Sequence, residues 1–131
     1  MARIGRFEDL EVWQNARLNC QFVKELFQTI GIRNNYRLRN QMEGRSGSIM
    51  DNIAAGFVRD GTKEFINFLS YSKGSVSEHK SQTYRAFDKK LISEKQFNNL
   101  VNMCELEKNK LGAFVYYLKY SEIKGQKFKR D

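Results

Sequence analysis

Apolar residues recur three and four positions apart along most of the chain, a spacing that places them on one face of a helix. The sequence contains no proline, so every residue has the backbone N–H that a helix interior needs. Short polar or glycine-containing stretches at residues 31–35, 60–62 and 89–93 divide the chain into four segments. Because connections this short force neighbouring helices to run antiparallel, the pattern predicts an all-α, antiparallel up-down four-helix bundle.

Each segment carries its own apolar stripe. The first stripe consists of Trp13, Ala16, Cys20, Val23, Phe27 and Ile30. The second consists of Leu38, Met42, Ile49, Ile53 and Gly56. The third consists of Phe65, Leu69, Ser72, Val76, His79, Thr83 and Ala86. The fourth consists of Phe97, Val101, Cys104, Leu111, Val115 and Leu118.

The expected helix ends carry residues that commonly start or stop helices. Gly31 is a candidate stop for the first helix, and Asn34 or Asn35 can cap the second. Thr62 can cap the third. The fourth opens with SEKQ at residues 93–96, the pattern of a capping box.

The chain is basic, and the excess lies towards its C-terminal end. It carries 23 Lys+Arg against 15 Asp+Glu, a net charge of +8. We expect one bundle domain over residues 1–121, followed by a basic, disordered tail at 122–131. Basic surfaces favour polyanions such as nucleic acid, and a merely solubilising surface is the open alternative. The candidate nucleic-acid contacts are Arg33, Arg37, Arg39, Lys89, Lys90, Lys119, Lys124, Lys127, Lys129 and Arg130.

Nothing in the sequence indicates catalysis, a metal or a cofactor. Cys20 and Cys104 have no further ligand at a metal-binding spacing, so we expect buried thiols. His79, the single histidine, lies on the third stripe next to Glu78, and adjacent helical side chains do not face one another. We favour a structural histidine over a catalytic base and expect no enzyme. The charged N-terminus and the lack of a long apolar stretch favour a cytoplasmic protein.

A polar network is predicted between the second and third helices. Ser48 and Asn52 are one turn apart, and Ser75 and Glu78 are similarly spaced on the facing helix. Arg59 is a further partner for these groups. Exposure of the same side chains to solvent is the alternative.

Other residues predict contacts beyond one core. Phe22, Leu26 and Tyr71 lie off the stripes and predict buried surface between subunits. Another helix, of this chain or of a second subunit, can pack closely on a face of small residues formed by Gly44, Ser48, Asp51 and Ala55. A group of aromatic residues either seals the bundle end or an interface, or stacks on unpaired bases: Phe114, Tyr116, Tyr117 and Tyr120.

Four motifs occur in order along the chain. They are FEDLEVWQNA at residues 7–16, SIMDNIAAGF at 48–57, Arg59 with KEF at 63–65 and FL at 68–69, and GS at 74–75 with Glu78. Together they resemble the motifs of the four-helix-bundle proteins encoded in intervening sequences of 23S ribosomal RNA genes. The resemblance implies a homopentameric ring and a role linked to RNA. It also implies a relation to accessory proteins of diversity-generating retroelements, which assist a reverse transcriptase by binding nucleic acid.

Two functions of different classes follow. The first is a non-enzymatic, oligomeric nucleic-acid-binding protein with little sequence specificity. RNA is favoured, because the chain has no helix-turn-helix or zinc pattern for reading DNA bases. The second is a protein-interaction scaffold or accessory subunit for a partner enzyme such as a reverse transcriptase. A continuous basic surface would favour the first, and an exposed apolar groove the second.

Overall fold

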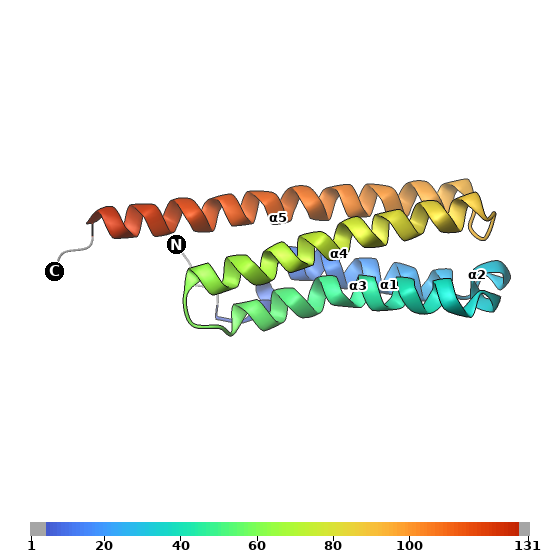
Figure 1. The fold of residues 1–131 in the computed structure, drawn as a ribbon, viewed down its shortest axis with the longest axis horizontal. Helices are drawn as coiled ribbons and strands as arrows, with labels where there is room; N and C mark the ends of the chain where they lie inside the picture. The colour runs from blue at the N-terminus through green and yellow to red at the C-terminus, as the bar shows by residue number, and fades with distance from the viewer. Residues whose placement is uncertain (1–4, 129–131) are drawn as a thin grey trace.

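The computed structural model describes residues 5–128, with side chains up to residue 121. Within this part of the chain the regular structure is entirely helical, which confirms the all-α prediction. The elements in chain order are η1 (Phe7–Asp9), α1 (Glu11–Leu26), α2 (Ile30–Asn34), α3 (Tyr36–Phe57), α4 (Thr62–Asp88) and α5 (Glu94–Phe128). The four long helices, α1, α3, α4 and α5, run antiparallel to their chain neighbours (Figure 1).

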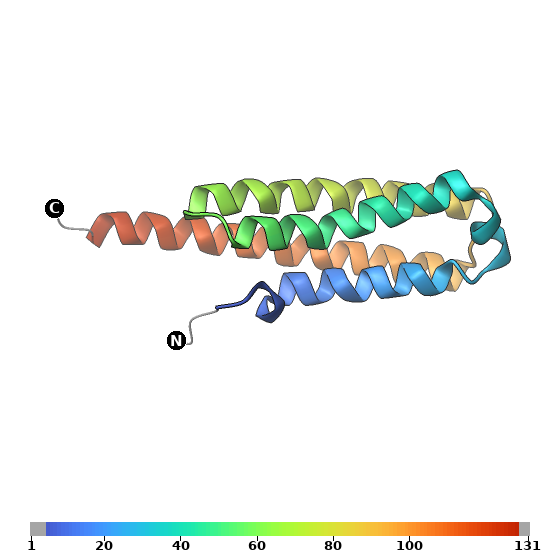
Figure 2. The same ribbon diagram turned by 90° about the horizontal axis from the view of Figure 1, so that it is seen from below.

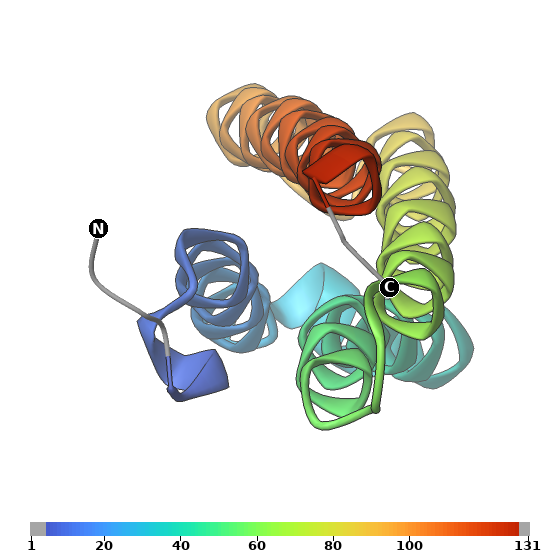
Figure 3. The same ribbon diagram turned by 90° about the vertical axis from the view of Figure 1, so that its left-hand side faces the viewer.

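The long helices surround one common axis, as the end-on view in Figure 3 shows. Helix α1 packs against α3 and α5, and helix α4 packs against the same two from the other side. The short helix α2 and the α4–α5 loop lie at one end of the bundle (Figure 1). The N-terminal η1 and the α3–α4 turn lie at the other (Figure 2). Helix α5 continues past that turn to Phe128, and therefore past residue 121, the expected end of the bundle domain.

Two of the predicted caps are confirmed. The Leu38 N–H donates to Asn35 Oδ1 at 3.2 Å, so Asn35 caps α3. At the start of α5 the Gln96 N–H donates to Ser93 Oγ at 3.1 Å. The Ser93 N–H donates in return to Gln96 Oε1 at 2.8 Å. These reciprocal bonds form the expected capping box.

The two other predicted helix ends are wrong. Helix α1 ends at Leu26, and Gly31 lies inside α2. A Cβ on Gly31 would lie 3.2 Å from the Leu91 carbonyl oxygen, so this glycine serves a close approach and not a stop. Thr62 makes no cap bond, because Gly61, with φ of 93°, forms the turn that precedes α4.

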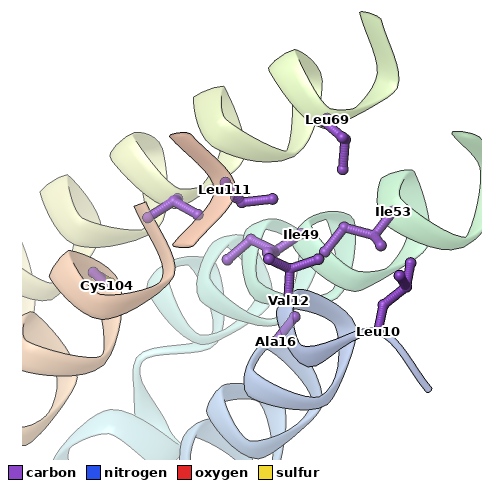
Figure 4. Close-up of a cluster of buried hydrophobic side chains, with 9 residues drawn as sticks. Leu10, Val12, Ala16, Ile49, Ile53, Leu69, Cys104 and Leu111 are labelled. Carbon is purple, nitrogen blue, oxygen red and sulfur yellow. The ribbon is translucent and has the colours of Figure 1, made fainter. Parts of the chain in front are cut away.

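Two clusters of buried apolar side chains fill the bundle, one towards each end. Side chains of the first cluster converge from all four long helices (Figure 4). It consists of Leu10, Val12, Ala16, Ile49, Ile53, Leu69, Val76, Cys104 and Leu111. The second, beside α2, consists of Val23, Leu26, Ile32, Leu38, Met42, Ala86, Ile92 and Leu100.

The predicted stripes of the second and third segments are confirmed, apart from Phe65, which is half-buried. The stripes of α1 and α5 are rotated from the predicted ones. Helix α1 buries Asn19 between the two clusters and leaves Cys20 half-buried. Leu26, expected between subunits, is buried within the protomer. Helix α5 buries Glu107 on the face that carries Cys104 and Leu111.

Candidate nucleic-acid interface

Five of the ten candidate basic residues lie at one end of the bundle, where α2 meets the α4–α5 loop (Figure 1). We call them the basic end: Arg33 in α2, Arg37 and Arg39 in the first turns of α3, and Lys89 and Lys90 in the loop. Arg39 is half-buried and the other four side chains are exposed. The short connections that make the helices antiparallel therefore also bring together basic residues that are far apart in sequence.

The loop after α4 is a Schellman turn. The Leu91 N–H donates to the Ala86 carbonyl oxygen at 3.0 Å, and the Lys90 N–H donates to the Phe87 carbonyl oxygen at 2.9 Å. Lys90 holds the left-handed position with φ of 60°, where glycine is the usual residue. The turn places a lysine at a strained position on the outermost surface of the bundle.

Helices α2 and α3 are tied together by one arginine. The Arg39 guanidinium lies over the Tyr36 ring, 5.0 Å from its centroid. Its Nη1 donates to the Arg33 carbonyl oxygen at 3.3 Å. Tyr36 itself remains 64% exposed, next to Arg37. The α2–α3 junction thus presents a tyrosine ring within the basic end.

Some basic residues elsewhere on the bundle are held in ion pairs. Arg45 pairs with Glu78 at 3.3 Å, and Lys110 pairs with Glu11 at 2.6 Å. Within the described side chains, the five residues of the basic end take part in no ion pair. The charges of the four exposed residues are therefore available to an external anion.

Three of the remaining candidates belong to the far end of α5. Lys119 is exposed there. Lys124 and Lys127 lie in the helix, but their side chains fall outside the described ones. Lys129 and Arg130 lie outside the described residues. Because α5 runs away from the α4–α5 loop, its backbone carries Lys119, Lys124 and Lys127 to the opposite end from the basic end (Figure 1).

The structure brings three of the five residues of the predicted polar network together. Asn52 Nδ2 donates to Ser48 Oγ at 3.0 Å, and Ser75 Oγ donates to the same oxygen at 2.9 Å. Glu78 instead faces solvent and pairs with Arg45. Arg59 lies over the Phe68 ring, 5.0 Å from its centroid, and does not join the hydrogen bonds.

A buried polar pair lies between the two apolar clusters. His79 is fully buried, and its Nε2 lies 3.3 Å from Asn19 Oδ1. Its Nδ1 has no hydrogen-bond partner. Burial lowers the pKa of His79 to about 4, so the ring is neutral at pH 7. A neutral histidine held by a buried amide fits the structural role expected from the sequence.

Glu107 is the buried carboxyl group that the sequence analysis missed. Its side chain is 1% exposed, and neither carboxylate oxygen has a hydrogen-bond partner. Burial, and secondarily the charge of Glu11, raise the pKa of Glu107 to about 8. The spacing of Leu100, Cys104, Glu107 and Leu111 was the available signal, because it places the glutamate on the inward face.

An open groove of about 970 Å³ runs between α1 and α3. Its lining includes Cys20, Val23, Phe27, Gly44, Gly47 and Asp51. A Cβ on either glycine would meet no atom within 4 Å, so no other element of the protomer packs closely on α3 at these two positions.

Neither a metal centre nor a membrane span is apparent in the described part of the chain. Residues 5–121 hold no group of three or more His, Cys, Asp or Glu that fits a metal ion. No helix in the same part of the chain combines the length and the apolar character needed to cross a bilayer.

Fold and site together define a small all-α protein of four long antiparallel helices with a concentrated basic end. The chain belongs to the family of 23S rRNA-intervening sequence proteins, whose family model matches residues 8–113. The match confirms the family indicated by the four motifs. A comparison with curated proteins finds no match.

Proposed function

We propose that this protein is a non-enzymatic, homo-oligomeric nucleic-acid-binding protein that contacts phosphates through the basic end. The observation that carries the proposal is the gathering of five basic residues, free of intramolecular ion pairs, from three separate segments. Arginine and lysine on such a surface neutralise phosphates and release condensed counterions. The description of the family, which ties it to 23S rRNA, favours RNA as the polymer.

The basic end is suited to contacts with the phosphate backbone of a nucleic acid and not to the recognition of individual bases. Four of its five side chains are exposed at helix ends and in a loop, and none lies in the middle of a long helix that could fill a major groove. We therefore expect weak sequence preference and a steep fall in affinity with salt. The slope of log affinity against log salt should be about −0.7 per single-strand phosphate or −0.9 per duplex phosphate.

The test compares two charge-matched double variants of the full chain. Arg37→Gln with Lys89→Gln removes two charges from the basic end. Lys63→Gln with Lys73→Gln removes two exposed charges from α4. The first variant should bind RNA more weakly and flatten the salt slope by about 1.5, whereas the second should bind as the parent does. Equal losses in both would refute the assigned surface, and a parent that binds nothing at low salt would refute the function.

The far end of α5 is a second proposed contact for the same ligand. Replacing the five candidate basic residues between positions 119 and 130 with glutamine should weaken binding to all sequences alike while helical content stays constant. The set is Lys119, Lys124, Lys127, Lys129 and Arg130. Unchanged affinity would restrict the interface to the basic end.

Assembly into a homopentamer is part of the proposal. Apolar side chains on three helices remain exposed, namely Leu18, Tyr71 and Leu106. Such surface favours burial against further copies. A pentamer of +8 chains would carry about +40, which strengthens attraction to a polyanion. Light scattering at micromolar concentration should give five times the mass of one chain. A monomeric mass would refute the proposed assembly.

A scaffold for a partner enzyme, such as a reverse transcriptase, is the second candidate. The α1–α3 groove favours it, because apolar Val23 and Phe27 line an open concavity. Gly47→Trp would obstruct this groove without touching the basic end. If that variant lost a partner protein but bound RNA normally, the scaffold function would replace or join the first.

A further inference from the structure

Tyr36 is placed unlike the other exposed tyrosines of the bundle. It is the first residue of α3 and lies between Asn35, which caps the helix, and Arg37. Among the described tyrosines, its ring is the one that a guanidinium covers. That guanidinium is anchored on the Arg33 carbonyl oxygen, so the ring has a fixed support on one face.

The exposed tyrosines elsewhere lack this combination. Tyr71 packs edge-on against Phe68, and Tyr84 packs edge-on against Phe97. Tyr116 is 73% exposed on α5, far along the chain from the basic end. It therefore matches Tyr36 in residue type and exposure but not in its surroundings.

An aromatic ring with one face covered and the other open to water is a stacking platform. Bases stack on such rings regardless of their identity, because every base has a π face, while neighbouring cations hold the backbone. Arg33 and Arg37 are exposed on either side of Tyr36 in sequence and supply cations for the flanking phosphates. Arg39 adds its positive charge behind the ring.

We propose that Tyr36 stacks on an unpaired base of the nucleic acid held at the basic end, and that the protein therefore prefers single-stranded segments to continuous duplex. This inference rests on the proposed nucleic-acid binding and specifies its substrate class. In a duplex the bases are stacked on one another, so the ring can meet only a terminal pair. The arginines alone would bind both forms.

The experiment measures fluorescence anisotropy of a labelled 12-nucleotide RNA, single-stranded or annealed to its complement, with the full-length protein at low salt. Tyr36→Ala should weaken single-strand binding by about five- to a hundredfold and leave duplex binding within about twofold. Tyr36→Phe should retain single-strand affinity because the ring is kept. Tyr84→Ala, which removes an exposed ring that no guanidinium covers, is the control and should change neither affinity.

Tyr36→Leu tests whether an affinity loss in the alanine variant comes only from displacement of Arg39. It keeps an apolar side chain beneath Arg39 while removing the ring. It should lose single-strand affinity as the alanine variant does, with an unchanged circular dichroism spectrum. Equal weakening of both RNA forms by Tyr36→Ala, or no weakening of either, would overturn the stacking role while leaving phosphate binding intact. A parent protein that binds neither form would overturn both proposals.

Discussion

The α3–α4 and α1–α5 interfaces both bury polar side chains, but they differ in the hydrogen bonds that these side chains make. Between α3 and α4, Ser72 Oγ donates to the Ile49 carbonyl oxygen, and Ser75 Oγ donates to Ser48 Oγ. Between α1 and α5, Glu107 is buried, and neither of its carboxylate oxygens has a hydrogen-bond partner. The charge of Glu11 contributes to raising the pKa of Glu107. The first interface therefore provides hydrogen bonds for its buried serines, whereas the second leaves a buried carboxyl group without a partner.

The difference indicates where the bundle is weakest. A hydrogen-bonded buried hydroxyl is close to neutral in its net effect, whereas an unpartnered buried group carries its full desolvation penalty. Lys110 pairs with Glu11 at 2.6 Å at the rim of the α1–α5 interface, but no cation reaches Glu107 in the described side chains. We infer that local opening of the bundle begins between α1 and α5.

The largest expected effect comes from removing the buried carboxyl group. The folded-state pKa of Glu107 is about 8, against an ordinary value of 4.5. The folded state therefore holds the proton more tightly, and stability is lost as pH rises from about 4.5 to about 8. Glu107→Leu should raise the free energy of unfolding by about 3 kcal/mol at pH 9 and by much less at pH 5. Urea unfolding at both pH values measures this.

Glu107→Gln separates charge from shape, because it keeps the length of the side chain and cannot ionise. It should abolish the same loss of stability between pH 5 and pH 9. The prediction would be contradicted if the parent lost no more stability between pH 5 and pH 9 than the glutamine variant. In that case folding would not raise the pKa of Glu107.

The pH dependence of stability that arises from His79 should be smaller than that from Glu107 and opposite in sign. Burial lowers its pKa from 6.5 to about 4, so the folded state binds the proton less tightly than the unfolded chain. Stability is therefore complete above about pH 6.5 and is lost as pH falls towards 4, by about 2 kcal/mol. His79→Gln keeps a polar group near Asn19 and should reduce this loss. Equal acid sensitivity of parent and variant would contradict the prediction.

The same two interfaces explain how much of the fold the sequence predicts. The α3 and α4 stripes were predicted correctly because apolar or small residues hold nearly all their inward positions. The α1 and α5 stripes were misplaced because two inward positions hold polar residues, Asn19 and Glu107. A prediction based on the spacing of apolar residues assigns such residues to the outer face. Burial of such groups depends on tertiary packing, which overrides local preference.

The candidate site shows a similar division. An antiparallel four-helix topology by itself places the start of the second helix and Lys89–Lys90 at one end of the bundle. The anchoring of Arg39 on the Arg33 carbonyl oxygen was not predictable, because it requires the five-residue helix α2. The stretch that contains α2 reads in sequence as a polar connection with a glycine stop.

A third prediction tests the close packing between α3 and α4. A Cβ on Gly56 would lie 2.5 Å from Phe68 Cβ and 3.0 Å from Phe65 Cδ1. Gly56→Ala should lower the free energy of unfolding by about 1–3 kcal/mol, although alanine is the better helix former. Thermal and urea unfolding measure the change. A gain in stability would show that the helices separate easily at this point.

The smallest expected effect concerns Gly47, on the same helix but facing the α1–α3 groove. A Cβ there would meet nothing within 4 Å, so Gly47→Ala should add about 0.5–1 kcal/mol of helix propensity at no steric cost. If a second subunit packs in this groove, the methyl group would instead obstruct it. Urea unfolding at two protein concentrations, with light scattering, separates the cases: a stabilised protein with unchanged mass keeps the groove free, whereas loss of assembly places the neighbouring subunit in it.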